Sequence, residues 1–321
     1  MANVLLTTYC NRTCKYCFAR SKVDLGKDQG DPSRNLSMEN LEKIIAFYKT
    51  SQLSRFVMLG GEPTLHPEFP QMVDRVLEEE SFESVLVFSN GIVPEKTLKY
   101  FADNTDPRLA MAMNLNSPED HSASEWERVT NTMRTLGKRI GLGINVYGAG
   151  QDYDYILDAI VTHGLSHHVR VGLTHPIAGT KNAYAREEDI PQIAKDLIVF
   201  AQKAHKLGIG FSFDCGFRFC MFTLDEHREL LRLGVLFRSN CDPIVDIGPD
   251  LGVWRCFPLI NDVAGSLDRF ESRKQIVSHF EKKYQTFKRM GNMAECPQCI
   301  YRKNNLCSGG CLARTMISFH R

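Results

Sequence analysis

The sequence has no long hydrophobic run, although 43% of its 321 residues are hydrophobic. None approaches the roughly 20 residues that a helix needs to cross a bilayer. Nor does one charge dominate, because 39 Lys and Arg and 38 Asp and Glu give a formal net charge of +1. We therefore expect neither nucleic acid nor a membrane as a partner. A strand expected from residue 3 leaves no room for a signal peptide.

Cysteine is absent between Cys17 and Cys215, although the chain has 11 cysteines. Three of them precede this gap and eight follow it. A disulfide framework would spread its cysteines over the chain, whereas two dense groups fit metal ligation in a reducing compartment. We therefore expect a cytoplasmic protein with metal centres.

The N-terminal group is Cys10, Cys14 and Cys17, which follows the apolar run 4–6. Three thiolates this close together can bind one soft metal centre. A cuboidal iron–sulfur cluster that only carries electrons takes four cysteines, so three leave one iron open to a substrate. Zinc is the alternative, because C-x2-C begins many zinc sites. Zinc sites usually split their ligands into two separated pairs, however, and no histidine lies near this triplet.

Strands and helices alternate over residues 1–214. The expected strands are 3–8, 56–59, 85–88, 109–113, 140–146, 169–173 and 209–213. This alternation predicts parallel β/α units, which right-handed crossovers curl into a barrel or an open sheet. Polar or glycine-rich motifs follow several of these strands, at the end where barrel active sites form. We therefore expect one shared site at that end.

Residues 215–321 differ in character, because they hold the second cysteine group. Residues 246–256 predict a hairpin, and 272–289 predict a helix. The last four cysteines have the spacing C-x2-C-x7-C-x3-C. Such spacing predicts a bound metal or cluster, and zinc-ribbon geometry also fits it.

Two motifs resemble those of the radical S-adenosylmethionine (SAM) enzymes. Cys10, Cys14 and Cys17, with Tyr16 before the last, resemble the C-x3-C-x2-C signature, and residues 60–63 resemble the GGEP motif. The resemblance implies an α/β fold with a partial (β/α)6 barrel over residues 1–214. It also implies a 4Fe–4S cluster whose open iron chelates SAM, and an electron donor such as flavodoxin or ferredoxin. SAM is then cleaved to a 5′-deoxyadenosyl radical, which removes hydrogen from a substrate.

The resemblance also suggests which side chains contact SAM, and these lie at the ends of the first four strands. The candidates are Tyr16, Gly60, Gly61, Glu62, Pro63, Ser89, Asn90, Asn114 and Asn116. Turn formation explains the glycines and Asn90 equally well. Thr174, His175 and Asp214 end later strands and are candidate substrate or catalytic contacts, although a lone histidine is more often structural.

The C-terminal cysteines resemble the SPASM extension of radical SAM enzymes, or its shorter twitch relative, which carry auxiliary 4Fe–4S clusters. The sequence departs from that pattern, because no cysteine follows Cys311 and an extra pair, Cys215 and Cys220, lies upstream. The resemblance implies that Cys241, Cys256 and Cys311 share one cluster with Cys215 or Cys220. A second cluster would then use Cys296, Cys299 and Cys307. One or two auxiliary clusters are therefore expected.

Three functions remain open on the sequence. The first is maturation of a peptide or protein, by crosslinking or oxidation, which relatives with this architecture often perform. Because the barrel is expected to begin at residue 3, no N-terminal leader-binding domain is expected, so a separate recognition protein or a short substrate would be needed. The second is the same chemistry on a small metabolite or cofactor precursor. The third is a zinc-binding module without catalysis.

Overall fold

The computed structural model describes residues 2–20, 22, 32–235 and 239–319. Strands and helices alternate through the first two thirds of the chain, as predicted. The strands are β1 (Asn3–Thr7), β2 (Arg55–Gly60), β3 (Ser84–Ser89), β4 (Leu109–Asn114), β5 (Ile140–Val146), β6 (His168–Leu173) and β7 (Gly210–Phe213). The helices between them are α1 (Met38–Thr50), α2 (Phe69–Leu77), α3 (Glu95–Asp103), α4 (Ala123–Leu136), α5 (Asp154–His163) and α6 (Ile190–Lys206).

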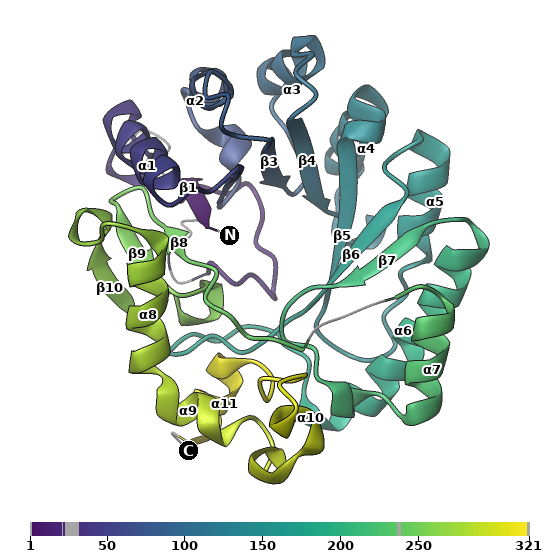
Figure 1. Ribbon diagram of the computed structural model, residues 1–321. Coiled ribbons are helices and arrows are strands. Elements are labelled where there is room, and N and C mark those ends of the chain that lie inside the picture. Colours follow the sequence, from purple (N-terminus) through teal and green to yellow (C-terminus); the bar gives the residue numbers. More distant parts are fainter. Residues whose placement is uncertain (1, 21, 23–31, 236–238, 320–321) are drawn as a thin grey trace.

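These strands form one curved sheet in which β1 to β7 are parallel neighbours in chain order. The helices α1 to α6 lie around its outside (Figure 1). The strand β7 is one edge of the sheet, and β10 (Val263–Ser266) is the other. The predicted α/β fold with a partial barrel is confirmed. Within the described residues, no helix is long and apolar enough to span a membrane.

Burial alternates along the strands and separates the two faces of the sheet. On β3, Val85 and Val87 are buried in the main core with residues of the surrounding helices, whereas Leu86 and Phe88 are partly accessible. Successive side chains of a strand point to opposite faces, so Leu86 and Phe88 point into the barrel. The inward positions of β4 and β5 carry small side chains, among them Ala110, Ala112 and Gly141. The barrel interior is therefore accessible to solvent.

The C-terminal residues extend the same sheet. The predicted hairpin is present as β8 (Asp246–Ile247) and β9 (Gly252–Trp254). The strand β8 pairs in parallel with β1, and β9 pairs with β10. The division of the chain into domains 1–214 and 215–321 stays a prediction, and the sheet continues across it.

Five helices complete the described C-terminal region: α7 (Leu224–Arg232), α8 (Arg273–Lys283), α9 (Gln285–Met290), α10 (Ile300–Lys303) and α11 (Leu312–Phe319). The single helix predicted over 272–289 is divided into α8 and α9 at Tyr284. The Tyr284 ring is buried and stacks on Phe280, and its hydroxyl donates to Asp262. The burial of the Tyr284 side chain thus coincides with the break between the two helices, which the sequence predicted as one.

A buried carboxyl group joins β1 to β8. Asp246 is fully buried, and its Oδ1 accepts a hydrogen bond of 2.7 Å from Asn3 Nδ2. Burial raises the pKa of Asp246 to about 7, because removal from water disfavours the charged form. The folded chain therefore holds this proton to a higher pH than the unfolded chain does.

Replacing Asp246 with Asn is expected to reduce the loss of stability at higher pH. Below the pKa of Asp246 in the unfolded chain, the carboxyl is protonated in both states and does not lower the stability of the wild type. Above that pKa the free energy of unfolding of the wild type falls with pH, until the pH passes the folded-state pKa of about 7. Between pH 5 and pH 8 the variant should gain on the order of 3 kcal/mol relative to the wild type, at about 1.4 kcal/mol per pKa unit. Anaerobic urea unfolding at both pH values measures this difference.

The matched control is Asp158→Asn, which changes an exposed carboxyl on α5. Its stability difference from the wild type should be the same at pH 5 and pH 8. Equal pH profiles for Asp246→Asn and the wild type would contradict the buried, protonated carboxyl.

Candidate functional site

The predicted site residues lie at the carboxyl ends of the barrel strands. The cysteine loop, defined as residues 8–18, follows β1, and Gly60 ends β2. Ser89 and Asn114 end β3 and β4, and residues 174–175 follow β6. Because parallel strands present these ends on one side, the topology brings the loops to one mouth, as the sequence predicted.

Two glycines let the cysteine loop lie directly on the end of β2. Gly61 N donates to Thr7 O at 2.9 Å, and Glu62 N donates to Tyr9 O at 2.6 Å. A Cβ at Gly60 would lie 2.4 Å from Thr7 O, and one at Gly61 would lie 2.1 Å from Tyr9 O. No side chain fits at either distance, so the glycines are needed for this backbone contact whatever ligand they bind.

Glu62 joins the ends of β2 and β3. Its side chain is fully buried. Oε1 accepts from Thr64 Oγ1 at 2.6 Å and from Ser89 Oγ at 3.0 Å, and Oε2 accepts from Asn90 N at 2.8 Å. Burial raises the pKa of Glu62 although these donors oppose it. The side chains of Glu62 and Ser89 thus fix the motif, and their contact with SAM stays a prediction.

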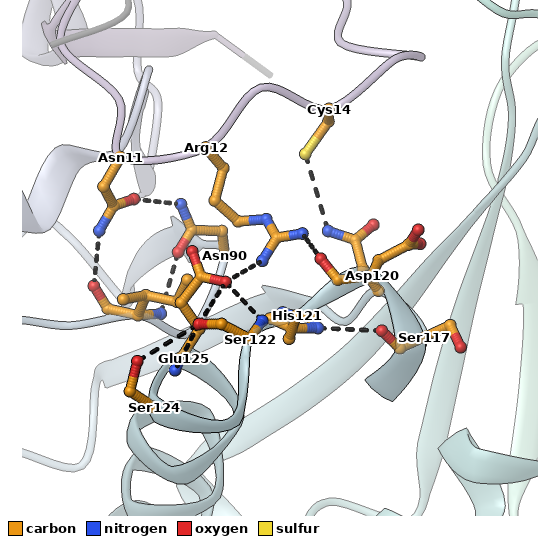
Figure 2. Close-up of polar contacts among 12 residues, drawn as sticks. Asn11, Arg12, Cys14, Asn90, Ser117, Asp120, His121, Ser122, Ser124 and Glu125 are labelled. Carbon is orange, nitrogen blue, oxygen red and sulfur yellow. Dashed lines mark hydrogen bonds and ion pairs between the residues drawn. The ribbon is translucent and has the colours of Figure 1, made fainter.

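Amide groups approach two of the three N-terminal sulfurs. Asn90 Nδ2 lies 3.9 Å from Cys10 Sγ and donates to Asn11 Oδ1 at 2.8 Å, as Figure 2 shows for the two asparagines. Asn116 Nδ2 lies 3.6 Å from Cys14 Sγ. Such donors stabilise thiolates, which are the form of cysteine that binds metal.

The three sulfurs also affect one another's ionisation. Burial raises the pKa of Cys10 to about 12, with smaller contributions from Glu62, Cys17 and Cys14. Burial also raises the pKa of Cys17, and the charge of Cys14 adds to it. The metal-free thiols of Cys10 and Cys17 are therefore protonated at neutral pH, and binding a metal releases their protons. A convergent, partly buried set of three thiols fits a 4Fe–4S cluster with one open iron.

Arg12 fastens the cysteine loop to the start of α4. Its Nη2 donates to Asp120 O at 2.8 Å, and its Nη1 lies 4.0 Å from Glu125 Oε2 (Figure 2). Glu125 in turn forms a capping box with Ser122. The sequence did not predict the contacts of Arg12 and Asn11, because their partners lie in loops that follow other strands.

Tyr16 and Asn114 have protein partners within the mouth. The Tyr16 ring stacks on Tyr147 at 5.4 Å, and its hydroxyl donates to Asn116 Oδ1. Asn114 Oδ1 accepts from Arg170 Nη2 at 2.6 Å. Arg170 also forms an ion pair with Asp214, which links β4 and β6 to the residue after β7.

His175 is 3% exposed, and neither of its ring nitrogens has a hydrogen-bond partner among the described residues. The same holds for Thr174 Oγ1. Burial lowers the pKa of His175 well below its usual value, and Arg314 and Arg218 lower it further, so the ring is neutral. A Cβ at Gly216 would lie 1.9 Å from His175 Nε2, which explains the glycine. His175 is therefore not a structural histidine whose ring nitrogens are hydrogen-bonded within the described part of the protein.

Electrostatic influences group most of the C-terminal cysteines into two sets. We call Cys215, Cys241, Cys256 and Cys311 the barrel-side set. The last three are buried, and Cys215 is exposed. Although the Cys215 residue as a whole is exposed, its thiol group is removed from water, which raises its pKa. The charges of Asp214, Cys241, Cys311 and Cys256 raise the pKa of Cys215 further, so these groups lie within electrostatic range of it.

We call Cys220, Cys296, Cys299 and Cys307 the outer set. Burial, and then the charges of Cys296 and Cys307, raise the pKa of Cys220, although Arg218 opposes this. Cys299 follows Cys296 through one 3-10 turn. Among the described residues, no three His, Cys, Asp or Glu side chains are placed to hold a single metal ion. A cuboidal cluster has a different requirement, because its four thiolates bind four separate irons.

A cavity of about 700 Å³ lies between the barrel mouth and the C-terminal region. Tyr147, Asn182 and Glu187 line it from the barrel, and Arg314 and Ile317 line it from α11. Glu187 accepts from Arg218 Nη2 at 2.6 Å and from Arg314 Nη1 at 2.8 Å. Tyr147 connects the cavity to Tyr16 in the cysteine loop.

Residues 4–161 match the Radical SAM superfamily. GTP 3′,8-cyclase of Vibrio atlanticus (strain LGP32) is 24% identical over 139 residues, which are 43% of this chain and 41% of the cyclase. GTP 3′,8-cyclase of Limosilactobacillus fermentum is 26% identical over 165 residues, 49% of this chain and 48% of the cyclase. The chain thus matches less than half the length of these curated relatives.

Solved structures resemble almost the whole fold. Streptococcus suis SuiB bound to S-adenosylmethionine has a TM-score of 0.64 at 13% identity, over 97% of this chain and 73% of SuiB. The enzyme anSMEcpe with bound AdoMet has a TM-score of 0.65 at 16% identity, over 97% of this chain and 88% of that chain. At such identities the similarity establishes the fold, including the region that contains both C-terminal cysteine sets.

The predicted family is therefore confirmed, and with it a 4Fe–4S cluster and SAM as cofactors. The match to a family of enzymes does not support the alternative of a zinc-binding module without catalysis. Cys10, Cys14 and Cys17 lie within electrostatic range of one another, and Cys10 lies beside Gly61. Residues 4–161 of this chain belong to the Radical SAM superfamily.

Proposed function

We propose that the enzyme removes a hydrogen atom from a peptide or protein substrate and thereby crosslinks or oxidises it. The supporting observation is that the structural likeness covers both cysteine-rich regions. SuiB bound to its precursor peptide SuiA has a TM-score of 0.64 over 97% of this chain. The enzyme anSMEcpe with AdoMet and the Cp18Cys peptide has a TM-score of 0.61 over the same share.

The cluster and SAM, when bound, supply a 5′-deoxyadenosyl radical. The chain's own residues hold and shield the site where that radical forms. Cys10, Cys14 and Cys17 hold the cluster, and the amides of Asn90 and Asn116 approach its thiolates. The inward faces of β3 to β5 leave the interior accessible for SAM, and Tyr16 is proposed to contact it.

Each C-terminal cysteine set is proposed to hold an auxiliary 4Fe–4S cluster. In the barrel-side set, Cys215 would share a cluster with Cys241, Cys256 and Cys311. The outer set assigns Cys220 to the cluster of Cys296 and Cys307, with Cys299 as its fourth ligand. The order of the cysteines in the sequence left this choice open.

The substrate is proposed to occupy the cavity between Tyr147 and α11. His175 lies behind the lining, directly before the lining residue Pro176, and its ring nitrogens have no partner among the described residues, so it is the proposed polar contact for a substrate. Asp214 and its partner Arg170 would position polar groups at the same mouth. An electron donor such as flavodoxin or ferredoxin, a separate leader-recognition protein and a cytoplasmic location remain predictions.

A small nucleotide is the second candidate substrate. The curated relatives that match part of this chain are GTP 3′,8-cyclases, which by their name act on GTP. Their matches cover less than half of this chain, whereas the peptide-bound structures resemble 97% of it. The peptide therefore remains the preferred substrate class.

The two substrate classes are expected to differ in how strongly they stimulate SAM cleavage. Anaerobically reconstituted enzyme, SAM and dithionite should be incubated with GTP or with peptides encoded beside the gene. We expect a peptide to raise 5′-deoxyadenosine at least about tenfold above the substrate-free rate, since a bound substrate positions the reacting carbon. Liquid chromatography with mass spectrometry measures both the nucleoside and the change in peptide mass.

GTP should leave the substrate-free rate unchanged in the same experiment. Stimulation by GTP, together with unaltered peptide masses, would instead establish the nucleotide as the substrate class. A scrambled peptide of the same composition is the matched control for non-specific stimulation.

A further inference from the structure

An arginine lies between two cysteines of the barrel-side set. Arg255 follows β9 and precedes Cys256, and it is 1% exposed. Its Nη1 lies 3.5 Å from Cys241 Sγ and 3.8 Å from Cys256 Sγ. Its Nη2 donates to Cys241 O, and its Nε has no hydrogen-bond partner among the described residues.

This buried guanidinium has no carboxylate partner within the described part of the chain. Every ion pair found there involves other residues. An uncompensated buried charge costs several kcal/mol, so buried charges are normally paired. The groups that Nη1 contacts are sulfurs, and neutral thiols are weak acceptors that carry no charge. A balanced charge at this position therefore requires negative charge beside Nη1.

Thiolates bound to an iron–sulfur cluster provide such charge. A 4Fe–4S cluster with four thiolates carries a net negative charge, which increases when the cluster is reduced. Its potential depends on this charge, on hydrogen bonds to its sulfurs and on solvent exposure. A fixed cation at the sulfurs stabilises the reduced form more than the oxidised form.

The outer set has different surroundings. Cys307 Sγ lies 3.0 Å from Ser239 Oγ and accepts from Gly309 N at 3.3 Å. These hydrogen-bond donors are neutral. The charge of Arg218 acts on Cys220 of this set, but Arg218 is paired with Glu187. The two sets therefore differ in whether an arginine without a carboxylate partner among the described residues lies against their sulfurs.

We propose that Arg255 is the buried counter-cation of the barrel-side auxiliary cluster and raises its reduction potential above that of the outer cluster. This inference rests on the proposed auxiliary clusters. Arg255 acts through the sulfurs that it contacts, so it is a positioning residue and does not touch substrate. An electron entering the auxiliary region is then retained by the cluster nearer the barrel.

The test compares Arg255→Gln and Arg255→Lys with the wild-type holoenzyme. Potentiometric titration followed by electron paramagnetic resonance measures the potential of each auxiliary cluster, and iron analysis measures loading. Arg255→Gln should lower the equilibrium constant for reducing the barrel-side cluster at least tenfold, a shift of 59 mV for a one-electron couple. Arg255→Lys keeps the charge and should shift it less. The outer cluster should keep its potential in both variants.

Arg139→Gln is the matched control. Arg139 is a partly buried arginine directly before β5 that donates to Phe101 O and Asn104 O. Its loss removes the same group without touching either cysteine set, so both auxiliary potentials should stay at their wild-type values.

The outcomes separate this inference from the proposed clusters. Wild-type protein with iron for the N-terminal cluster alone would refute the auxiliary clusters themselves. Full iron in Arg255→Gln with unchanged potentials would overturn the role of Arg255 and leave the clusters standing. If Arg255→Gln loses the barrel-side cluster, rescue by Arg255→Lys supports the counter-cation, and equal loss in both variants overturns it.

Discussion

Replacing Cys10, Cys14 and Cys17 together with Ala is expected to abolish 5′-deoxyadenosine formation while C-terminal iron stays bound. The three thiolates are the proposed ligands of the SAM-binding cluster, and they lie within electrostatic range of one another. Without them no open iron is held for SAM, so the product should fall to the level of a reaction without enzyme. Bound iron should fall by about four atoms per chain, the content of one 4Fe–4S cluster.

The retained iron is an internal control for folding. The barrel-side and outer sets draw their cysteines from residues 215–311, and they share no ligand with the N-terminal loop. Thr13→Ala is the matched variant within that loop, because Thr13 is exposed between Cys10 and Cys14. It should keep both its iron and its product. Undiminished 5′-deoxyadenosine from the triple variant would refute the assignment of the SAM-binding cluster.

Features that depend on neighbouring residues could be predicted from the sequence. The spacing of Cys10, Cys14 and Cys17 follows from the chain itself, and so does the alternation of strands and helices. The start of α1 is equally local, because Ser37 Oγ accepts from Asn40 N at 3.1 Å, three residues on. These interactions depend little on the rest of the fold.

Features that depend on which loops meet could not be predicted. Asn3 and Asp246 are 243 positions apart and yet pair across β1 and β8. Glu62 meets Asn90 because β2 and β3 are neighbours, and the sequence alone suggested a ligand contact for both. Cysteine order likewise left the C-terminal ligand sets open. The fold favours one allocation, because Cys215 lies within electrostatic range of Cys241, Cys256 and Cys311, and the two sets stay a proposal.

Gly61 also contacts a loop that is distant in the sequence, and replacing it is expected to have a large effect on cluster binding. Gly61→Ala is expected to prevent the N-terminal cluster from binding. The added Cβ would lie 2.1 Å from Tyr9 O and 3.0 Å from Cys10 Cβ. Carbon contacts are favourable at about 3.5–4.0 Å, so the cysteine loop must move by about 1 Å. Overpacking of this kind costs about 1–3 kcal/mol of unfolding free energy.

Movement of that size is decisive for the cluster, because ligands must stay within about 0.5 Å of their working geometry. Iron content and anaerobic urea unfolding measure the two effects. The matched control is Gly141→Ala on β5, whose added Cβ would meet nothing within 4 Å. The control should retain its iron and lose no stability. Full cluster loading in Gly61→Ala would show that the cysteine loop tolerates displacement, and that Gly61 serves a ligand rather than the backbone contact.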